Sequence, residues 1–212
     1  MKKLISLCLA MTMLLGSMVG CGKTPTSSSG NPSNSEGGGL GTPQTFKFGL
    51  TVASTHPYSI AAQNFAELVE EKSGGNMTVD LYYDSSLGDD AALMESMQMN
   101  AVTFALVGPA GIAPMCPIYE FFDLPCLFAT RDAAYAFQES EPVLELMDSL
   151  SANGLRGLGF YENGYYAISN NAKEITTVDG LNNLKLRSMT SEMAIKSWEC
   201  LNVQPVAMAF GE

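Results

Sequence analysis

The chain has 212 residues, of which 46% are hydrophobic and 16% charged, a balance typical of a globular protein with a buried core. This composition excludes a chain that is disordered throughout. Acidic residues outnumber basic ones by 22 to 11, and the net charge of −11 argues against a nucleic-acid partner, because phosphate binding requires clustered lysine and arginine. A small anionic ligand is compatible with this charge, since a few buried groups are enough to make a local positive site.

The first 20 residues have the features of a secretory signal peptide. Lys2 and Lys3 provide the positive start, and residues 4–19 are an apolar run without an acidic residue. The run is shorter than the ~20 residues that span a bilayer, so a permanent transmembrane helix is the weaker alternative. The motif Met18-Val19-Gly20-Cys21 resembles a bacterial lipobox, which predicts that Cys21 becomes the lipidated first residue of the mature protein.

Residues 21–44 are rich in Ser, Thr, Gly, Pro and Asn and are predicted to form a flexible lipoprotein tether. A disordered N-terminus without a role has the same composition, and only the preceding Cys21 favours the tether. Three cysteines follow in the body, at Cys116, Cys126 and Cys200, an odd number for a disulfide framework, although a Cys116–Cys126 bridge stays open. With a single histidine and no CxxC pair, no metal site or cofactor is expected.

The folded body is expected to begin at Thr45 with a β-α-β-α-β alternation. Alternating or apolar runs at residues 46–52, 77–83 and 102–107 predict strands, and helical periodicity at residues 61–72 and 91–99 predicts helices. Asp89 or Asp90 suits the N-cap of the second helix. The pattern predicts a largely parallel sheet covered by helices, an α/β fold.

The second half continues the alternation less regularly. Residues 130–147 carry helical periodicity with a break near Pro142, and residues 154–160 are predicted to form a strand. Turn residues between two apolar stretches at residues 161–170 indicate a crossing between two lobes. Ligands of open α/β sheets bind outside the carboxyl ends of strands, so the site is expected near such crossings and strand ends.

A short strand ending at Ser188 presents an arginine. Alternation places Leu184 and Leu186 on one face and Lys185 and Arg187 on the other, so the apolar face can pack while the guanidinium points elsewhere. A guanidinium pairs bidentately with a carboxylate. On the spacing alone, an exposed and solvated strand arginine without a ligand is the favoured interpretation. The other arginines of the body, Arg131 and Arg156, are expected at the surface.

Several short motifs, weak singly, occur together in an order typical of one family. They are His56-Pro57, residues 65–75, Leu87-Gly88-Asp89-Asp90, Asp123-Leu124-Pro125, Gly180-Leu181, Leu184-Lys185-Leu186-Arg187 and residues 205–210. In this respect residues 47–212 resemble the extracytoplasmic solute receptors of tripartite ATP-independent periplasmic (TRAP) transporters, of the C4-dicarboxylate-binding DctP-like type. The resemblance implies a two-lobed, periplasmic-binding-protein-like (type II-like) fold, with residues 45–160 in lobe I and residues 161–212 in part of lobe II.

The resemblance also implies function and partners. It predicts an extracytoplasmic, lipid-anchored receptor without catalysis, which captures a small organic acid and delivers it to a small and a large TRAP membrane subunit. The carboxylate-clamping arginine of the family falls on Arg187. Many members carry an arginine where this chain has Tyr166, so the ligand is expected to differ from a simple dicarboxylate.

Four further positions are assigned to the ligand by the same resemblance. Phe210 matches an aromatic residue of the family's site, although a core phenylalanine would look the same. Thr51, His56 and Gly108 fall on loops of the first lobe that face the ligand. For His56 a plain loop position, and for Gly108 a role in the turn only, remain alternatives. The chain also stops at Glu212, before segments that the family continues with. A C-terminally truncated receptor is therefore expected, with a complete shorter protein as the alternative.

Two other classes compete with this interpretation. A secreted, lipid-anchored hydrolase is disfavoured by the single histidine and by the absence of a Gly-x-Ser-x-Gly motif. A solute-binding lipoprotein of an ATP-driven transporter is disfavoured by the order of the motifs.

Overall fold

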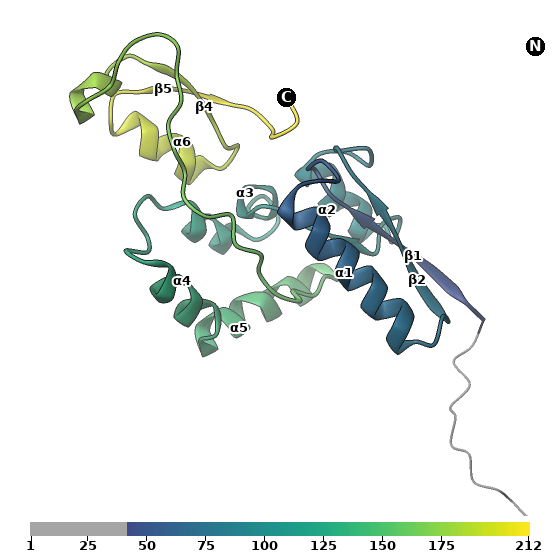
Figure 1. Ribbon diagram of the computed structural model, residues 1–212. Coiled ribbons are helices and arrows are strands. Elements are labelled where there is room, and N and C mark those ends of the chain that lie inside the picture. Colours follow the sequence, from purple (N-terminus) through teal and green to yellow (C-terminus); the bar gives the residue numbers. More distant parts are fainter. Residues whose placement is uncertain (1–41) are drawn as a thin grey trace, which may run out of the picture. The chain divides into compact units, whose positions relative to one another are not determined.

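The computed structural model describes residues 42–212 (Figure 1). The predicted signal peptide, the lipidation site Cys21 and residues 21–41 of the predicted tether lie outside the described residues. Within residues 42–212, the structure has no helix with the length and apolar character needed to cross a membrane.

The N-terminal half of the described chain contains the predicted parallel sheet. Its strands are β1 (Gln44–Gly49), β2 (Met77–Tyr82) and β3 (Phe104–Ala105), in the order β2-β1-β3. Both neighbours run parallel to β1, joined by α1 (Pro57–Lys72) and α2 (Asp90–Gln98). The predicted β-α-β-α-β order is therefore confirmed, with β3 shorter than the predicted residues 102–107 because only Phe48 and Gly49 pair with it.

The helix α1 forms because the chain supplies a cap, a proline start and an apolar face. The ring Nδ1 of His56 accepts a hydrogen bond from the Tyr58 backbone N–H at 3.2 Å, and Pro57 occupies the first turn, where no N–H is required. The fully buried Ala62 packs against Phe48. Figure 1 shows α1 lying along β1 and β2, with its C-terminal end beside their N-terminal ends.

The helix α2 is fixed to β1 by a close approach between Gly49 and Leu93. The Asp89 carboxylate accepts from the Ala92 N–H at 2.9 Å and caps the helix, as the sequence predicts. A Cβ at Gly49 would lie 2.3 Å from Leu93 Cδ2, so any larger residue at this point of the strand would displace the Leu93 side chain. Leu93, only 1% exposed, therefore holds the N-terminal end of α2 against the sheet.

A helical stretch follows β3. It consists of α3 (Pro109–Ile112), η1 (Pro117–Asp123), α4 (Arg131–Gln138), α5 (Glu141–Ser149) and η2 (Leu150–Asn153). The predicted break near Pro142 is confirmed, since this proline opens α5. Cys116 is buried beside Tyr119 and Leu150, and all three cysteines of the described chain are free, so no Cys116–Cys126 bridge forms.

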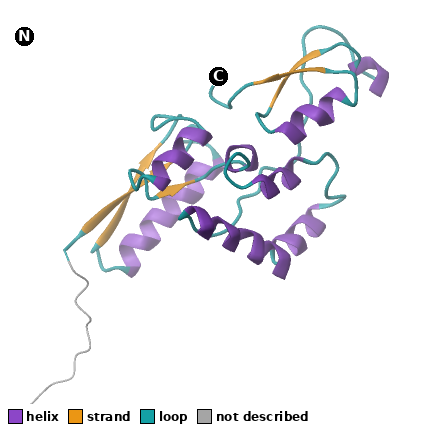
Figure 2. Cartoon of the chain, turned by 180° about the vertical axis from the view of Figure 1, so that it is seen from behind, coloured by secondary structure: helices purple, strands orange, loops and turns teal. Residues whose placement is uncertain are grey.

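The predicted strand over residues 154–160 is wrong. Residues 155–170 form neither helix nor strand, and this coil (green in Figure 1, loop in Figure 2) connects η2 to the C-terminal elements. A Cβ at Gly157 would lie 2.8 Å from Met147 Cβ, so the backbone there rests on α5. Residues 154–160 contain three glycines, which weaken a strand, and no strand of the described chain pairs with this segment.

The C-terminal elements form a separate β-α-β unit. It contains η3 (Val178–Leu181), β4 (Lys185–Ser188), α6 (Glu192–Glu199) and β5 (Gln204–Ala207), and β4 and β5 are parallel. Leu181, Leu184 and Val203 form its core, with Leu186 packed against them, whereas Lys185 and Arg187 are exposed. The predicted alternation along β4 is therefore confirmed.

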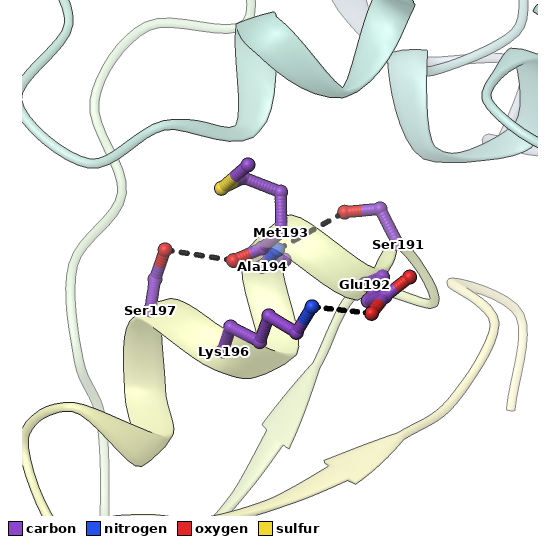
Figure 3. Close-up of polar contacts among 6 residues, drawn as sticks. All are labelled: Ser191, Glu192, Met193, Ala194, Lys196 and Ser197. Carbon is purple, nitrogen blue, oxygen red and sulfur yellow. Dashed lines mark hydrogen bonds and ion pairs between the residues drawn. The ribbon is translucent and has the colours of Figure 1, made fainter. Parts of the chain in front are cut away.

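Short polar contacts define the start of α6 (Figure 3). The buried Ser191 side chain accepts from the Ala194 N–H at 3.2 Å, and Ser197 Oγ donates to the Met193 carbonyl at 2.7 Å. Glu192 and Lys196 form an ion pair one turn apart on the exposed side. The capped helix forms the connection between the parallel strands β4 and β5.

Candidate ligand-binding site

Gly108 contacts the Asp90 carboxylate, and two more predicted site residues, Thr51 and Arg187, lie near it. Asp90 is the first residue of α2, and its Oδ2 accepts from the Gly108 backbone N–H at 3.1 Å. The Thr51 side chain and the Arg187 charge both lie close enough to Asp90 to lower its pKa. Thr51 follows the end of β1, Gly108 follows the end of β3, and Arg187 lies near the end of β4. These three residues therefore lie at strand ends, where the sequence predicts the site.

Asp90 itself was not assigned to the site by the sequence, where it served only as an alternative cap. Its Oδ1 is buried and has no hydrogen-bond partner within residues 42–212. A Cβ at Gly111 would lie 2.5 Å from Asp90 Cβ, so a glycine lets α3 close over this carboxylate. A buried carboxylate oxygen without a partner is costly unless a ligand or water supplies a donor.

The environment raises the pKa of Asp90 above its ordinary value. Desolvation by burial is the main cause, and the neighbouring Asp89 adds to it, whereas the Gly108 N–H, the Thr51 side chain and the Arg187 charge oppose it. The folded state therefore holds this proton more tightly than the unfolded chain does.

This shift predicts a pH-dependent stability difference between the wild-type protein and Asp90→Asn. A raised carboxyl pKa stabilises the folded state at acidic pH, and this contribution is lost as pH rises from the ordinary aspartate range through the raised value. Asparagine does not ionise, so we expect Asp90→Asn to gain stability relative to the wild type across this interval. Urea unfolding at a series of pH values measures the difference, and a difference that does not change with pH would contradict the assignment.

One nitrogen of the Arg187 guanidinium is already hydrogen-bonded within the C-terminal β-α-β unit. Its Nε donates to the Met208 carbonyl oxygen at 3.0 Å, just beyond the end of β5. This bond fixes the plane of the guanidinium. The two terminal Nη groups make no hydrogen bond to residues 42–212, and they form the half of the fork that pairs with a carboxylate end-on.

His56 and Tyr166, two more predicted residues, lie near a common neighbour, Tyr58. The His56 and Tyr58 ring centroids are 4.7 Å apart, and the nearby Tyr166 contributes to the raised pKa of Tyr58. That pKa is about 12, chiefly because of burial and then because of Tyr166 and Glu162. The Tyr166 hydroxyl donates to Met189 Sδ at 3.2 Å, two residues after Arg187.

Phe210 lies at the C-terminal end of the chain and is 66% exposed, which excludes the alternative of a core phenylalanine. Its neighbour Gly211 approaches the first sheet, because a Cβ there would lie 3.2 Å from Ser85 Oγ. The Ser85 hydroxyl in turn donates to the Thr51 carbonyl at 3.5 Å. The segment that carries Phe210 thus lies near the loop that contains Thr51.

These contacts place five of the six predicted residues in two groups, and Phe210 belongs to neither. One surrounds Asp90 and contains Thr51, Gly108 and Arg187; the other surrounds Tyr58 and contains His56 and Tyr166. An open hollow of about 620 Å³ is lined by Tyr166 and by residues 168–170 and 173–175, and it reaches neither Asp90 nor Arg187. No group of residues suited to hold a metal ion occurs in the described chain.

Residues 48–212 match the bacterial extracellular solute-binding proteins, family 7 (DctP). The chain is 29% identical over 171 residues to the 2,3-diketo-L-gulonate-binding periplasmic protein YiaO of Escherichia coli (strain K12), covering 80% of this chain and 52% of the relative. It is 32% identical over 165 residues to the C4-dicarboxylate-binding protein DctB of Bacillus subtilis (strain 168), covering 78% and 47%. The chain thus spans about half the length of the curated relatives that it matches.

The fold is similar to that of solved receptors. The sugar acid binding protein DctPAm of Advenella mimigardefordensis, solved with galactonate, superimposes with a TM-score of 0.79 at 33% identity, covering 81% of this chain and 55% of that one. A TRAP periplasmic solute-binding protein of Sulfurospirillum deleyianum, solved with succinate, gives a TM-score of 0.77 at 24% identity. At this identity the similarity concerns the fold only. The predicted α/β fold of the two-lobed solute receptors is confirmed.

Proposed function

Because the chain belongs to family 7 of the bacterial extracellular solute-binding proteins, we propose that it forms the ligand-binding part of a TRAP transporter receptor for a carboxylate-bearing organic acid. The observation that carries this proposal is the geometry of Arg187. Its Nε donates to the Met208 carbonyl, and its two Nη groups make no hydrogen bond within residues 42–212, which leaves them available to a carboxylate. Thr51, Gly108 and Asp90 lie close by and provide the polar surroundings.

The same residues favour an acid with one carboxylate and several hydroxyls. Of the three arginines in the sequence, Arg131 pairs with Glu162, and only Arg187 acts on the Asp90 group. A second ligand carboxylate near Asp90 would meet a buried acid instead of a cation, which costs free energy. Tyrosine hydroxyls and the orphan Asp90 oxygen suit neutral hydroxyl groups, which donate as well as accept.

Calorimetric titration of the full-length protein with galactonate, glucuronate and succinate tests this proposal. We expect one of the two sugar acids to bind at least about tenfold more tightly than succinate, a difference of about 1.4 kcal/mol, because succinate requires a second cation. Tighter binding of succinate would overturn the proposed ligand class. Absence of binding by any carboxylate of a wider organic-acid panel would overturn the receptor function itself.

The relatives are named as binding proteins, and the position of the histidine also weighs against a hydrolase. His56 Nδ1 accepts a backbone N–H, whereas a triad histidine donates from Nδ1 to a carboxylate. A receptor of an ATP-driven transporter is the remaining alternative. Neighbouring genes for a small and a large membrane subunit would support the TRAP proposal, and a neighbouring ATPase gene would contradict it.

The cellular setting belongs to the same proposal. The protein acts outside the cytoplasm, is held to the membrane through a lipid on Cys21 and delivers its ligand to the two TRAP membrane subunits. Residues 45–160 form its first lobe, and residues 161–212 contribute to the second. The intact mass of the mature protein tests the anchor, because a start at any residue other than a lipidated Cys21 would exclude it.

A further inference from the structure

The position of Tyr166 requires support from outside its own coil segment. Tyr166 is 74% exposed and lies on the coil of residues 155–170, which has neither helix nor strand. A side chain on an unsupported coil contributes little to affinity, because binding must first order the segment. Any useful role of Tyr166 therefore depends on what fixes this coil.

Glu162 attaches the coil to α4. It is the only acidic residue between Asp148 and Glu174, and both of its carboxylate oxygens are engaged. Arg131 Nε lies 2.7 Å from Oε1, and the Tyr135 hydroxyl donates to Oε2. Arg131 and Tyr135 are four residues apart and share one face of a helix, so they grip the carboxylate as a pair.

The start of α4, which carries this grip, is itself capped. Thr130 Oγ1 accepts from the Ala133 N–H at 3.2 Å, so Arg131 projects from a defined first turn. A predicted surface position of Arg131 is confirmed, since its side chain is 59% exposed. At that exposure the ion pair contributes only about 0–1 kcal/mol to the stability of the fold.

The coil on both sides of Glu162 reaches the ligand-binding residues. The Tyr161 ring lies 6.0 Å from that of Tyr58, the neighbour of His56. Asn163 Nδ2 donates to the Tyr166 hydroxyl at 3.4 Å, and this hydroxyl donates to Met189. A short stretch of coil thus connects α4, α1 and the end of β4, with Glu162 at its centre.

We propose that Glu162, held by Arg131 and Tyr135, is a positioning residue that orders the coil of residues 161–166 and presents Tyr166 to the ligand. This inference rests on the proposed function, because it concerns the same site. The anchor acts on ligand affinity through Tyr166, and it contributes little to the stability of the fold.

The test is a double-mutant cycle in the full-length protein, with the acid of the panel that binds most tightly as the probe. We expect Glu162→Gln and Arg131→Ala each to weaken binding about two- to tenfold, the range expected when one side chain must be ordered anew. In a Tyr166→Ala background the same substitutions should have no further effect. Thermal unfolding should change by no more than a few degrees in either variant.

Glu145→Gln is the matched control. Glu145 is an exposed residue of α5 without an ion pair to residues 42–212, and its substitution should leave affinity unchanged. Wild-type affinity in Glu162→Gln, or an equal loss in the presence and absence of Tyr166, would overturn the inference. Both outcomes leave the proposed function intact, because the wild-type protein still binds the acid.

Discussion

Replacing Arg187 with alanine is expected to weaken binding of the carboxylate ligand by about 2–5 kcal/mol, at least about thirtyfold in affinity. The substitution removes the guanidinium near Asp90, and a loss of this size is expected because a bound acid that covers Arg187 excludes water from the charge pair. Isothermal titration with the tightest acid of the panel measures the loss. The folded unit should survive, because Arg187 is exposed and lies on the face of β4 opposite Leu184.

The substitution Arg187→Lys tests whether binding depends on the positive charge alone or also on the forked guanidinium. Lysine keeps the positive charge but has no fork and no Nε to donate to Met208, so most of the loss should persist. Arg156→Ala removes another exposed arginine and should leave affinity unchanged within about twofold. Full affinity in both Arg187 variants would remove this residue from the site.

Leu93→Ala is expected to lower the free energy of unfolding by about 2–5 kcal/mol. Leu93 is 1% exposed and fills the space above Gly49, where a side chain on the strand has no room. Glycine has no side chain that could fill the cavity left by the substitution, and we expect the surrounding backbone to stay in place. The expected loss therefore lies above the lower limit of this range. Chemical denaturation followed by circular dichroism measures it.

Met99→Ala is the control for that substitution. Met99 is the C-cap of the same helix and is 70% exposed, so its truncation should cost less than about 0.5 kcal/mol. Equal losses in the two variants would show that α2 is not held to the sheet through Leu93.

The parallel sheet was predictable because each strand and helix of residues 44–105 carries its own local signal. Alternation predicts β1 and β2, helical spacing predicts α1, and the Asp89 cap marks the start of α2. The exposed position of Arg187 was equally predictable, since it follows from the period of two along a strand.

Other features depend on contacts between distant residues and leave no local signal. Asp90 reads as a helix cap, and nothing in its neighbourhood indicates that Gly108, 18 residues later, donates to its carboxylate. The sequence of residues 154–160 predicts a strand, but a strand also requires a partner, and the described sheets offer none to this segment. The sequence does not predict Tyr58 as a site residue, because its position in the first turn of α1 carries no signal that distinguishes it from other helix residues.

The β4–α6–β5 unit closes over a short length of chain. Its strands pair Lys185 with Gln204 and Ser188 with Ala207, and the Arg187–Met208 bond spans only 21 residues. A loop this short costs little entropy to close. The orientation of the arginine is thus a property of one small segment, acquired without the first sheet, and substitutions around β1 to β3 can alter the ligand's surroundings while the cation stays in place.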